Sequence, residues 1–261
     1  MNIAELHDKL TELYPRRLSA EWDNDGIMVS GDMNAVVERV MIALDPSYGT
    51  LKYAAERGFD TVITHHPLLF RPIKSVNEMT LSGKRVVEAM RAGISVLSFH
   101  TRLDAADGGV NDALCKRLGF VPTEKFGDEE APEIGRIVTL QSKISAAELA
   151  VHVRDTLGCR SVRMNRQSSA DVNKQCIHRI AVCGGDGKGM IYPAISAGCD
   201  AFITGDAGYN MALDAAEEGL ITIEAGHYHT EAPVCEALAD TVFKLTGIRA
   251  EIFNSCGYEL I

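Results

Sequence analysis

Two adjacent histidines, His65 and His66, directly follow a short run of β-branched residues and precede Pro67. Such a run, bounded by turn residues, is typical of a buried strand, which we expect over residues 61–64. Neutral imidazole is a ligand for zinc, iron, nickel and copper ions. Because neighbouring residues of an extended chain point to opposite sides, each histidine could serve one of two ions. The alternative is an exposed loop pair that binds no metal.

Two further clusters of ligand-type residues follow predicted strands, His100 with Asp104 and His227 with Glu231. The residues of each pair are four apart, so a helical turn would place both on one face. In α/β sheets, ligand sites form at the carboxyl ends of the strands. Three histidines and two carboxylates suit a pair of divalent ions about 3.5–4 Å apart, such as zinc, iron, manganese, cobalt or nickel. The alternative is three unrelated polar turns.

Hydrolysis is the chemistry that such a pair of ions favours. A water bridging both ions would have its pKa lowered toward neutrality and become a hydroxide nucleophile, while the second ion polarises a carbonyl, phosphoryl or purine-ring carbon. His100 and His229 are then candidate catalytic residues. Either could be a general base, or could orient Asp104 or Glu231. The alternative for each is a structural role.

Two other motifs carry possible chemistry. The stretch Gly184-Gly185-Asp186-Gly187-Lys188-Gly189 resembles a phosphate-cradling turn but lacks the residue order of a P-loop, so an ordinary tight turn is the alternative. Trp22-Asp23-Asn24-Asp25-Gly26 contains the single tryptophan and several turn formers. Here we expect a tight turn packed under the indole in preference to direct catalysis.

An α/β fold must position these residues. A strand over residues 40–45, a helix over 47–58 and the double-histidine strand form a β–α–β unit, which implies parallel strands. A further helix and a strand over residues 94–99 follow. The order strand–helix–strand–helix–strand then recurs after residue 179.

The recurrence predicts an internal duplication into two similar α/β halves. At a shift of 140 positions, three residues of the first half match three of the second: Gly58, Asp60 and Thr64 match Gly198, Asp200 and Thr204. The acidic segment 119–132, which contains Pro and Gly, is read as a boundary. We expect residues 1–124 plus 222–261 to form a metal-binding domain, and residues 125–221 to form a second α/β domain.

Composition narrows the function classes. The 261 residues are 46% hydrophobic and carry a formal net charge of −10, without a dense Lys/Arg cluster, which argues against nucleic-acid binding. The seven cysteines contain no C-x-x-C pair, which argues against disulfides and a structural zinc site. We find no signal peptide and no apolar run long enough to span a bilayer. We therefore predict a cytoplasmic protein that does not enter a membrane.

The clusters together resemble the Nif-three-like dinuclear-metal family, whose members are also called GTP cyclohydrolase I type 2 homologues. The motifs that carry the resemblance are Trp22-Asp23-Asn24 with Gly26, Thr64-His65-His66-Pro67, His100-Thr101 with Leu103-Asp104, Gly108-Gly109-Val110-Asn111, Thr204-Gly205-Asp206, and Gly226-His227 with Thr230-Glu231. The resemblance implies an α/β fold, two divalent metal ions and a homo-oligomer, in the form of a hexameric ring. It also implies the metal ligands His65, His66, Asp104, His227 and Glu231, with His100 outside that set.

Two residues depart from the family pattern. Arg102 stands where the family usually has Asn, and Asn210 stands where many members have His. We expect both to face the cleft and to affect the choice of substrate. The predicted function is a metal-dependent hydrolase of a nucleotide or other small phosphorylated metabolite, with GTP cyclohydrolase-like chemistry as one candidate. The alternatives are a protein that stores or delivers metal without catalysis, and a ring-shaped scaffold.

Overall fold

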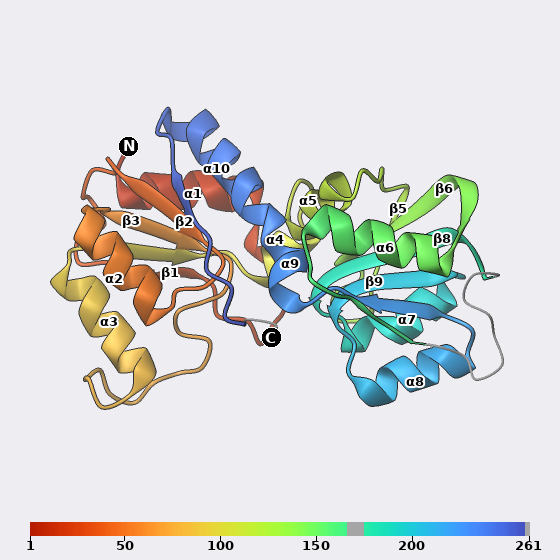
Figure 1. Cartoon of the computed structure of the whole chain (residues 1–261). Coiled ribbons are helices and arrows are strands. Elements are labelled where there is room, and N and C mark those ends of the chain that lie inside the picture. The colour runs from red at the N-terminus through yellow and green to blue at the C-terminus, as the bar shows by residue number, and fades with distance from the viewer. Residues whose placement is uncertain (166–174, 259–261) are drawn as a thin grey trace. The chain divides into compact units, whose positions relative to one another are not determined.

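A computed structural model describes residues 1–165 and 175–258 (Figure 1). The described residues form two compact units, each with its own sheet and helices. The first unit comprises residues 1–106 and 235–257, and the second comprises the described residues of 107–234 together with Tyr258. The predicted α/β class with two similar halves is confirmed.

The first unit is built on a five-stranded sheet. Its strands, in spatial order, are β1 (Gly26–Val29), β4 (Ser95–Ser98), β3 (Thr61–Thr64), β2 (Val40–Ala43) and β11 (Glu251–Phe253). Strands β2, β3, β4 and β11 run parallel, while β1 is antiparallel to β4. Figure 1 shows α2 (Tyr48–Arg57) and α3 (Leu81–Arg91) over one face, and α1 (Ile3–Leu13) and α10 (Pro233–Thr246) over the other. Strands β2, β3 and β4 are buried along their whole length, as strands covered on both faces must be.

The helix ends of the first unit follow from local sequence. At the start of α1, the side chain of Asn2 accepts from the backbone N–H of Glu5. The side chain of Glu5 accepts in turn from the backbone N–H of Asn2. This reciprocal cap satisfies two N–H groups that have no partner within the helix. A different helix, α2, ends at Gly58, which takes the left-handed conformation (φ 70°) that glycine adopts without steric cost. The predicted end of the helix over residues 47–58 is thereby confirmed.

The second unit is built on a six-stranded sheet. Its strands, in spatial order, are β5 (Glu124–Phe126), β6 (Gly135–Ser145), β8 (Cys176–Asp186), β9 (Ala201–Asp206), β10 (Ile221–Glu224) and β7 (Arg163–Met164). Helices α5 (Val110–Arg117) and α6 (Ala146–Leu157) contribute to one apolar cluster of this sheet, and α7 (Ile191–Ser196) and α8 (Tyr209–Glu217) to another. Figure 1 shows α6 and α7 on opposite faces. Strand β5 lies inside the segment that we expected to be a boundary.

The compact units divide the chain at other points than those expected from the sequence. We expected boundaries after residues 124 and 221, whereas the units divide after Ala106 and Val234. Strand β10, expected in the metal-binding domain, pairs in parallel with β9, with Glu224 opposite Thr204. Hydrophobic pattern identifies a strand but not its partner, which is why the sheet membership of β10 could not be predicted.

The predicted repeat is present in backbone detail. Val40 pairs with Thr61 in the first sheet, and the residues 140 positions later, Ile180 and Ala201, pair in the second. The carboxylate of Asp60 accepts from the N–H groups of residues 38 and 39, and that of Asp200 accepts from those of residues 178 and 179. The same side chain therefore holds the chain entering the first parallel strand in both halves.

The lengths of the helices and the state of the cysteines match what the composition predicts. Among the described residues no helix has the length and apolarity needed to cross a membrane. All seven cysteines are free, and four of them, Cys115, Cys159, Cys183 and Cys235, are buried. Burial raises the pKa of the Cys115 thiol to about 12. The buried cysteines thus behave as small apolar residues, as expected.

Removing either repeated carboxylate should destabilise its own unit. Asp60→Ala leaves two backbone N–H groups without their acceptor, as does Asp200→Ala, and each loss should cost about 1–3 kcal/mol. Urea unfolding of the two variants measures this, with Asp240→Ala on the exposed side of α10 as the control. Variants no less stable than the control would show that the carboxylates do not hold these turns.

Candidate metal centre

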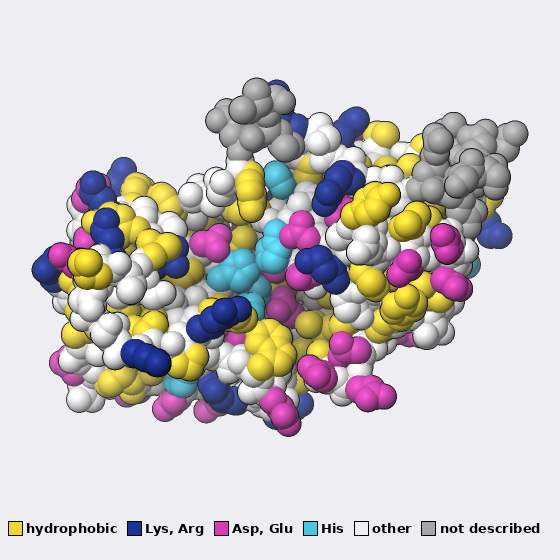
Figure 2. All heavy atoms as spheres, turned by 90° about the horizontal axis from the view of Figure 1, so that it is seen from below, with side chains coloured by type: hydrophobic (Ala, Val, Ile, Leu, Met, Phe, Trp, Pro, Cys, Tyr) yellow, Lys and Arg dark blue, Asp and Glu magenta, His cyan; other side chains and the backbone are white. Residues whose placement is uncertain are grey.

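Three histidines of the first unit gather at the carboxyl ends of β3 and β4. Thr64 lies opposite Ser98, so the next residues along the two strands, His65 and Phe99, are neighbours. His65, His66 and His100 each offer a ring nitrogen, and these nitrogens lie within 4.8 Å of one another. On the face of the molecule that Figure 2 draws, histidine side chains gather in one patch. The expectation that these strand ends share one edge is correct for β3 and β4.

The backbone sets the orientation of His65. Its ring is fully buried, and its Nδ1 lies 2.9 Å from the carbonyl oxygen of Phe99. A carbonyl only accepts, so Nδ1 must carry the hydrogen. In the neutral ring the lone pair is then on Nε2, which is the nitrogen available to a metal ion.

A carboxylate orients His66 in the same way. Ala43 pairs with Thr64, and two residues further along each strand lie Asp45 and His66. The Nδ1 of His66 donates to Asp45 Oδ1 at 2.8 Å. Asp45 is the last residue of the strand expected over residues 40–45, and it was not among the predicted site residues. Its place beside the double-histidine strand in a β–α–β unit was the signal that could have identified it as the partner of His66.

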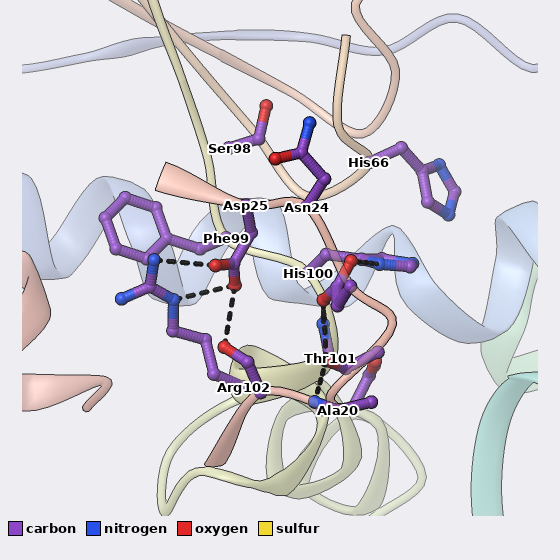
Figure 3. Close-up of polar contacts among 12 residues, drawn as sticks. Ala20, Asn24, Asp25, His66, Ser98, Phe99, His100, Thr101 and Arg102 are labelled. Carbon is purple, nitrogen blue, oxygen red and sulfur yellow. Dashed lines mark hydrogen bonds and ion pairs between the residues drawn. The ribbon is translucent and has the colours of Figure 1, made fainter. Parts of the chain in front are cut away.

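His100 is held by Asp23, which belongs to the turn after the first helix. The Nδ1 of His100 donates to Asp23 Oδ1 at 2.8 Å, and the N–H and hydroxyl of Thr101 donate to Oδ2 at 3.0 and 2.6 Å. Figure 3 shows Thr101 and His100 at this contact. Burial by itself raises the pKa of Asp23, but the hydrogen bonds from His100 and Thr101 outweigh it and lower the pKa to about 2. Asp23 is therefore an anion that keeps the hydrogen of His100 on Nδ1.

The turn that contains Asp23 differs from the expectation in one respect. The N–H of Asp23 donates to the carbonyl of Ala20 at 3.0 Å, so the predicted tight turn is present. The indole of Trp22, however, is 56% exposed and does not bury the turn. The hydrogen bonds of Asp23 hold the turn in place, which leaves the tryptophan free to face solvent.

Asp104 completes the first unit's cluster. It lies on the short helix α4 (Thr101–Ala105), and its Oδ1 is 3.6 Å from Nε2 of His65. Ligand atoms about 2.1 Å from a tetrahedral zinc ion lie ~3.4 Å from one another. The spacing of this carboxylate and this imidazole therefore fits two ligands of one ion.

The second unit has its own pair of ligand-type residues, at the two ends of α9 (His227–Glu231). The Nδ1 of His227 lies 3.0 Å from Asp206 Oδ2, and its Nε2 lies 3.2 Å from Glu231 Oε2. The four-residue spacing thus places both side chains on one helical face, as expected if the chain turns helical after Gly226. As in the first unit, an acceptor on Nδ1 leaves Nε2 directed toward a carboxylate.

Glycines make room for α9. A Cβ on Gly185 (φ 67°) would lie 2.1 Å from Glu231 Oε1, and one on Gly205 would lie 2.8 Å from the Cα of His227. The N–H of Gly185 donates to the hydroxyl of Thr230, while those of Gly187 and Lys188 also donate within the protein. These N–H groups are not available to cradle a phosphate, which supports the tight-turn interpretation of this segment.

His229 lies on the same helix as His227 and Glu231 but two residues from each, a spacing that does not share a helical face. Its side chain is partly buried, and burial lowers its pKa. Among the described residues, His229 belongs to none of the groups whose ligand atoms converge.

Arg102 does not face a cleft, so the expectation that it affects substrate choice through such a contact is wrong. It is 1% exposed, and its Nε and Nη2 donate to the two carboxylate oxygens of Asp25 at 2.7 and 2.9 Å. Its guanidinium stacks on Phe99, with the guanidinium carbon 4.7 Å from the ring centroid (Figure 3). Arg102 therefore ties α4, which carries Asp104, to the segment before β1. Asn210, the other departure, is exposed in the first turn of α8.

The geometry can now be compared with known proteins. A family model described as Duf34/NIF3 (NGG1p interacting factor 3) matches residues 1–256. The chain belongs to the Duf34/NIF3 family. A relative from Clostridium perfringens named GTP cyclohydrolase 1 type 2 homolog is 31% identical, over 93% of this chain and 91% of the relative.

Two further comparisons agree with this assignment to the Duf34/NIF3 family. A relative of the same name from Streptococcus pneumoniae is 35% identical, over 82% of this chain and 80% of its own length. A crystal structure of a hypothetical protein from Staphylococcus aureus superposes with a TM-score of 0.89 at 26% identity, covering 100% of this chain and 99% of that one. The family and the fold predicted from the sequence motifs are confirmed.

The buried Arg102–Asp25 pair yields a stability prediction. Asp25→Ala leaves a buried guanidinium without its carboxylate and should destabilise the first unit by about 3–5 kcal/mol. Combining it with Arg102→Met removes that buried charge and should recover part of the loss. Urea unfolding measures both variants, and Asp155→Ala, which breaks an exposed Arg–Asp contact, should change little. A double variant as unstable as the sum of the single variants would contradict a coupled pair.

The lowered pKa of Asp23 yields a pH prediction. The pKa is about 2 in the folded protein against an ordinary value of 3.8, so ionised Asp23 adds stability above pH 4 that is lost as the pH falls toward 2. The difference in unfolding free energy between wild type and Asp23→Asn should therefore shrink as the pH is lowered from 4 to 2. Urea unfolding at stepped pH measures this difference. A difference that stays constant across that window would contradict the hydrogen-bonding role of the Asp23 carboxylate.

Proposed function

We propose that this chain is a dinuclear-metal-dependent hydrolase that acts on a nucleotide or another small phosphorylated metabolite. One observation carries the proposal: four histidines in two units have their Nδ1 held by an oxygen acceptor. The acceptors are Phe99, Asp45, Asp23 and Asp206, which hold His65, His66, His100 and His227 respectively. Metal-binding histidines almost always have this kind of partner on the ring nitrogen that does not bind the ion. A histidine that transfers a proton is likewise oriented by such a bond.

The donor set supports divalent ions of intermediate softness. The proposed ligands are the imidazoles of His65, His66 and His227 and the carboxylates of Asp104 and Glu231. Such mixtures of nitrogen and oxygen suit zinc, iron, manganese, cobalt or nickel. His227 and Glu231 alone supply two ligand groups, fewer than the three or four protein ligands usual for zinc. We therefore propose that all five residues act together on one pair of ions.

Hydrolysis follows from the same residues. When bound, two divalent ions would lower the pKa of a bridging water and supply a hydroxide nucleophile. Each of the two carboxylates can bridge two cations, while each histidine serves one. His100, whose hydrogen is kept on Nδ1 by the Asp23 anion, presents the lone pair of Nε2 beside His65 and His66. We propose His100 as the group that accepts or donates a proton. His229 is less suited to this role, because its position on α9 does not share the helical face of His227 and Glu231.

The substrate class rests on the relatives. Proteins 31% and 35% identical to this chain are named GTP cyclohydrolase 1 type 2 homolog, which makes purine nucleotides the first substrates to test. The assembly and location implied by the family resemblance, a ring of six copies in the cytoplasm, belong to the same proposal. Light scattering should then give the mass of six chains.

Metal content tests the proposed site directly. Protein purified without added metal should contain two divalent ions per chain, while Asp104→Ala and Glu231→Ala should each lose metal markedly, because a shared ligand is removed. Plasma mass spectrometry gives the number of ions. His229→Ala is the matched control, since it changes the same helix without touching a proposed ligand, and it should retain both ions. Less than one ion in wild type after supply of Zn, Mn or Fe would refute the metal site.

Turnover separates the enzyme from a metal store. Wild type should hydrolyse at least one member of a panel of nucleotides and phosphoesters. Asp104→Ala should abolish this activity, and His100→Gln should reduce it about 100-fold or more while metal is retained, because general acid–base catalysis contributes that much. Full metal occupancy and reversible release with no turnover across the panel would favour storage or delivery instead.

A further inference from the structure

Two large aromatic side chains lie exposed beside the histidines of the first unit. Trp22 is 56% exposed and Phe70 is 47% exposed. Their ring centroids are 5.9 Å apart and their planes are inclined by 70°. The ring of His100 lies 6.2 Å from that of Trp22 and 6.0 Å from that of Phe70, edge-on to both. We call these three rings the aromatic platform.

Hydrogen bonds hold the platform in this exposed position. The residues that follow Trp22 are anchored, because Asp23 accepts from His100 and Thr101, and the amide of Asn24 donates to the carbonyl of Leu69. The second bond ties the tryptophan turn to the loop that presents Phe70. Asp23 itself is buried. The hydrogen bonds of Asp23 and Asn24 thus fix the conformation of this turn, in which the indole of Trp22 is exposed to solvent.

Burial of apolar area does not explain this arrangement. An exposed indole forgoes much of the stabilisation that burying a large apolar side chain supplies. Three rings in edge-on contact also form a rigid surface that loses little freedom when it binds a ligand. The platform reaches the proposed metal ligands, because the ring of His100 lies 5.3 Å from that of His65 and 5.7 Å from that of His66.

We infer that the platform binds a planar aromatic ring of the substrate, which stacks on the exposed indole of Trp22 with Phe70 bracing it from the side. The inference rests on the proposed function and narrows its substrate class to molecules that carry a heteroaromatic ring, such as a nucleobase. The edge-on geometry at 5.9 Å leaves no slot between Trp22 and Phe70, so the ring lies over the indole and not between the two side chains. Metabolites that carry a phosphate but no aromatic ring lack this contact.

The single tryptophan of the chain makes the platform directly observable. Guanosine should quench the fluorescence of Trp22 in a saturable way, whereas ribose 5-phosphate at the same concentrations should not. Phe70→Ala should weaken guanosine binding about fivefold, because an aromatic neighbour contributes about 0.5–1.5 kcal/mol. Trp22→Ala removes the reporter, so calorimetry is used for that variant, and we expect at least a tenfold weaker affinity. Tyr192→Ala, which removes a 53% exposed aromatic of α7, is the matched control and should bind as wild type does.

Metal content of the same samples separates this inference from the proposed function. Trp22→Ala and Phe70→Ala should retain the ions of wild type, since neither residue is a proposed ligand. Linear, unsaturable quenching, equal quenching by ribose 5-phosphate, or unchanged affinity in both variants would overturn the platform even if two ions are present. Saturable guanosine binding in a protein that holds no metal would leave the platform intact and refute the metal centre.

Discussion

The fixed tautomer of four histidines is the constraint on which the site depends. A free imidazole can carry its hydrogen on either nitrogen and can rotate its ring. In a cluster of free imidazoles, the nitrogen that faces a metal ion would therefore sometimes be protonated and sometimes carry the lone pair. Here an oxygen acceptor at each Nδ1 removes both freedoms for His65, His66, His100 and His227. Three of the four acceptors are carboxylates, which when ionised only accept, so each leaves the lone pair of its neutral imidazole on Nε2. Any function that uses these rings therefore depends on residues that need not touch a substrate or an ion.

Strand register supplies two of these acceptors, Asp45 and Phe99, so this part of the site follows from the fold. Thr64 pairs with Ala43 on one side and with Ser98 on the other, so the strand ends place Asp45, Phe99 and the double histidine next to each other without special side-chain contacts. A slip of one strand by one residue would turn every side chain to the opposite face. Asp60 accepts from the N–H of residue 39, directly before β2, and Asp200 accepts from that of residue 179 in β8. Each carboxylate therefore helps to fix strand register in its own sheet.

Local structure could be predicted from the sequence, whereas the strands and side chains that pair across the fold could not. Helix caps such as Asn2 and Gly58 and the β-branched strands follow from local chemistry, and the 140-residue repeat could be read from matched Gly and Asp positions. The ligand-type residues were recognisable because they stand at strand ends. The pairing of Asp23 with His100 and that of Arg102 with Asp25 each join residues 77 positions apart. The sheet membership of β10 depends on strand order. A motif shows that a residue matters but not which way its side chain points, as Arg102 and Trp22 both demonstrate.

The two halves share a backbone plan but carry their ligand-type residues at different places in it. At the 140-position shift, the ends of β3 and β9 correspond, and His65 and His66 stand where the second half has Gly205 and Asp206. A side chain on Gly205 would collide with the Cα of His227, so a histidine there would prevent α9 from packing where it does. Asp45, which orients His66, corresponds to Gly185, whose missing side chain leaves room for Glu231. In the second half the ligand-type residues therefore lie on a helix instead of at the end of a strand, and the space for that helix requires glycines.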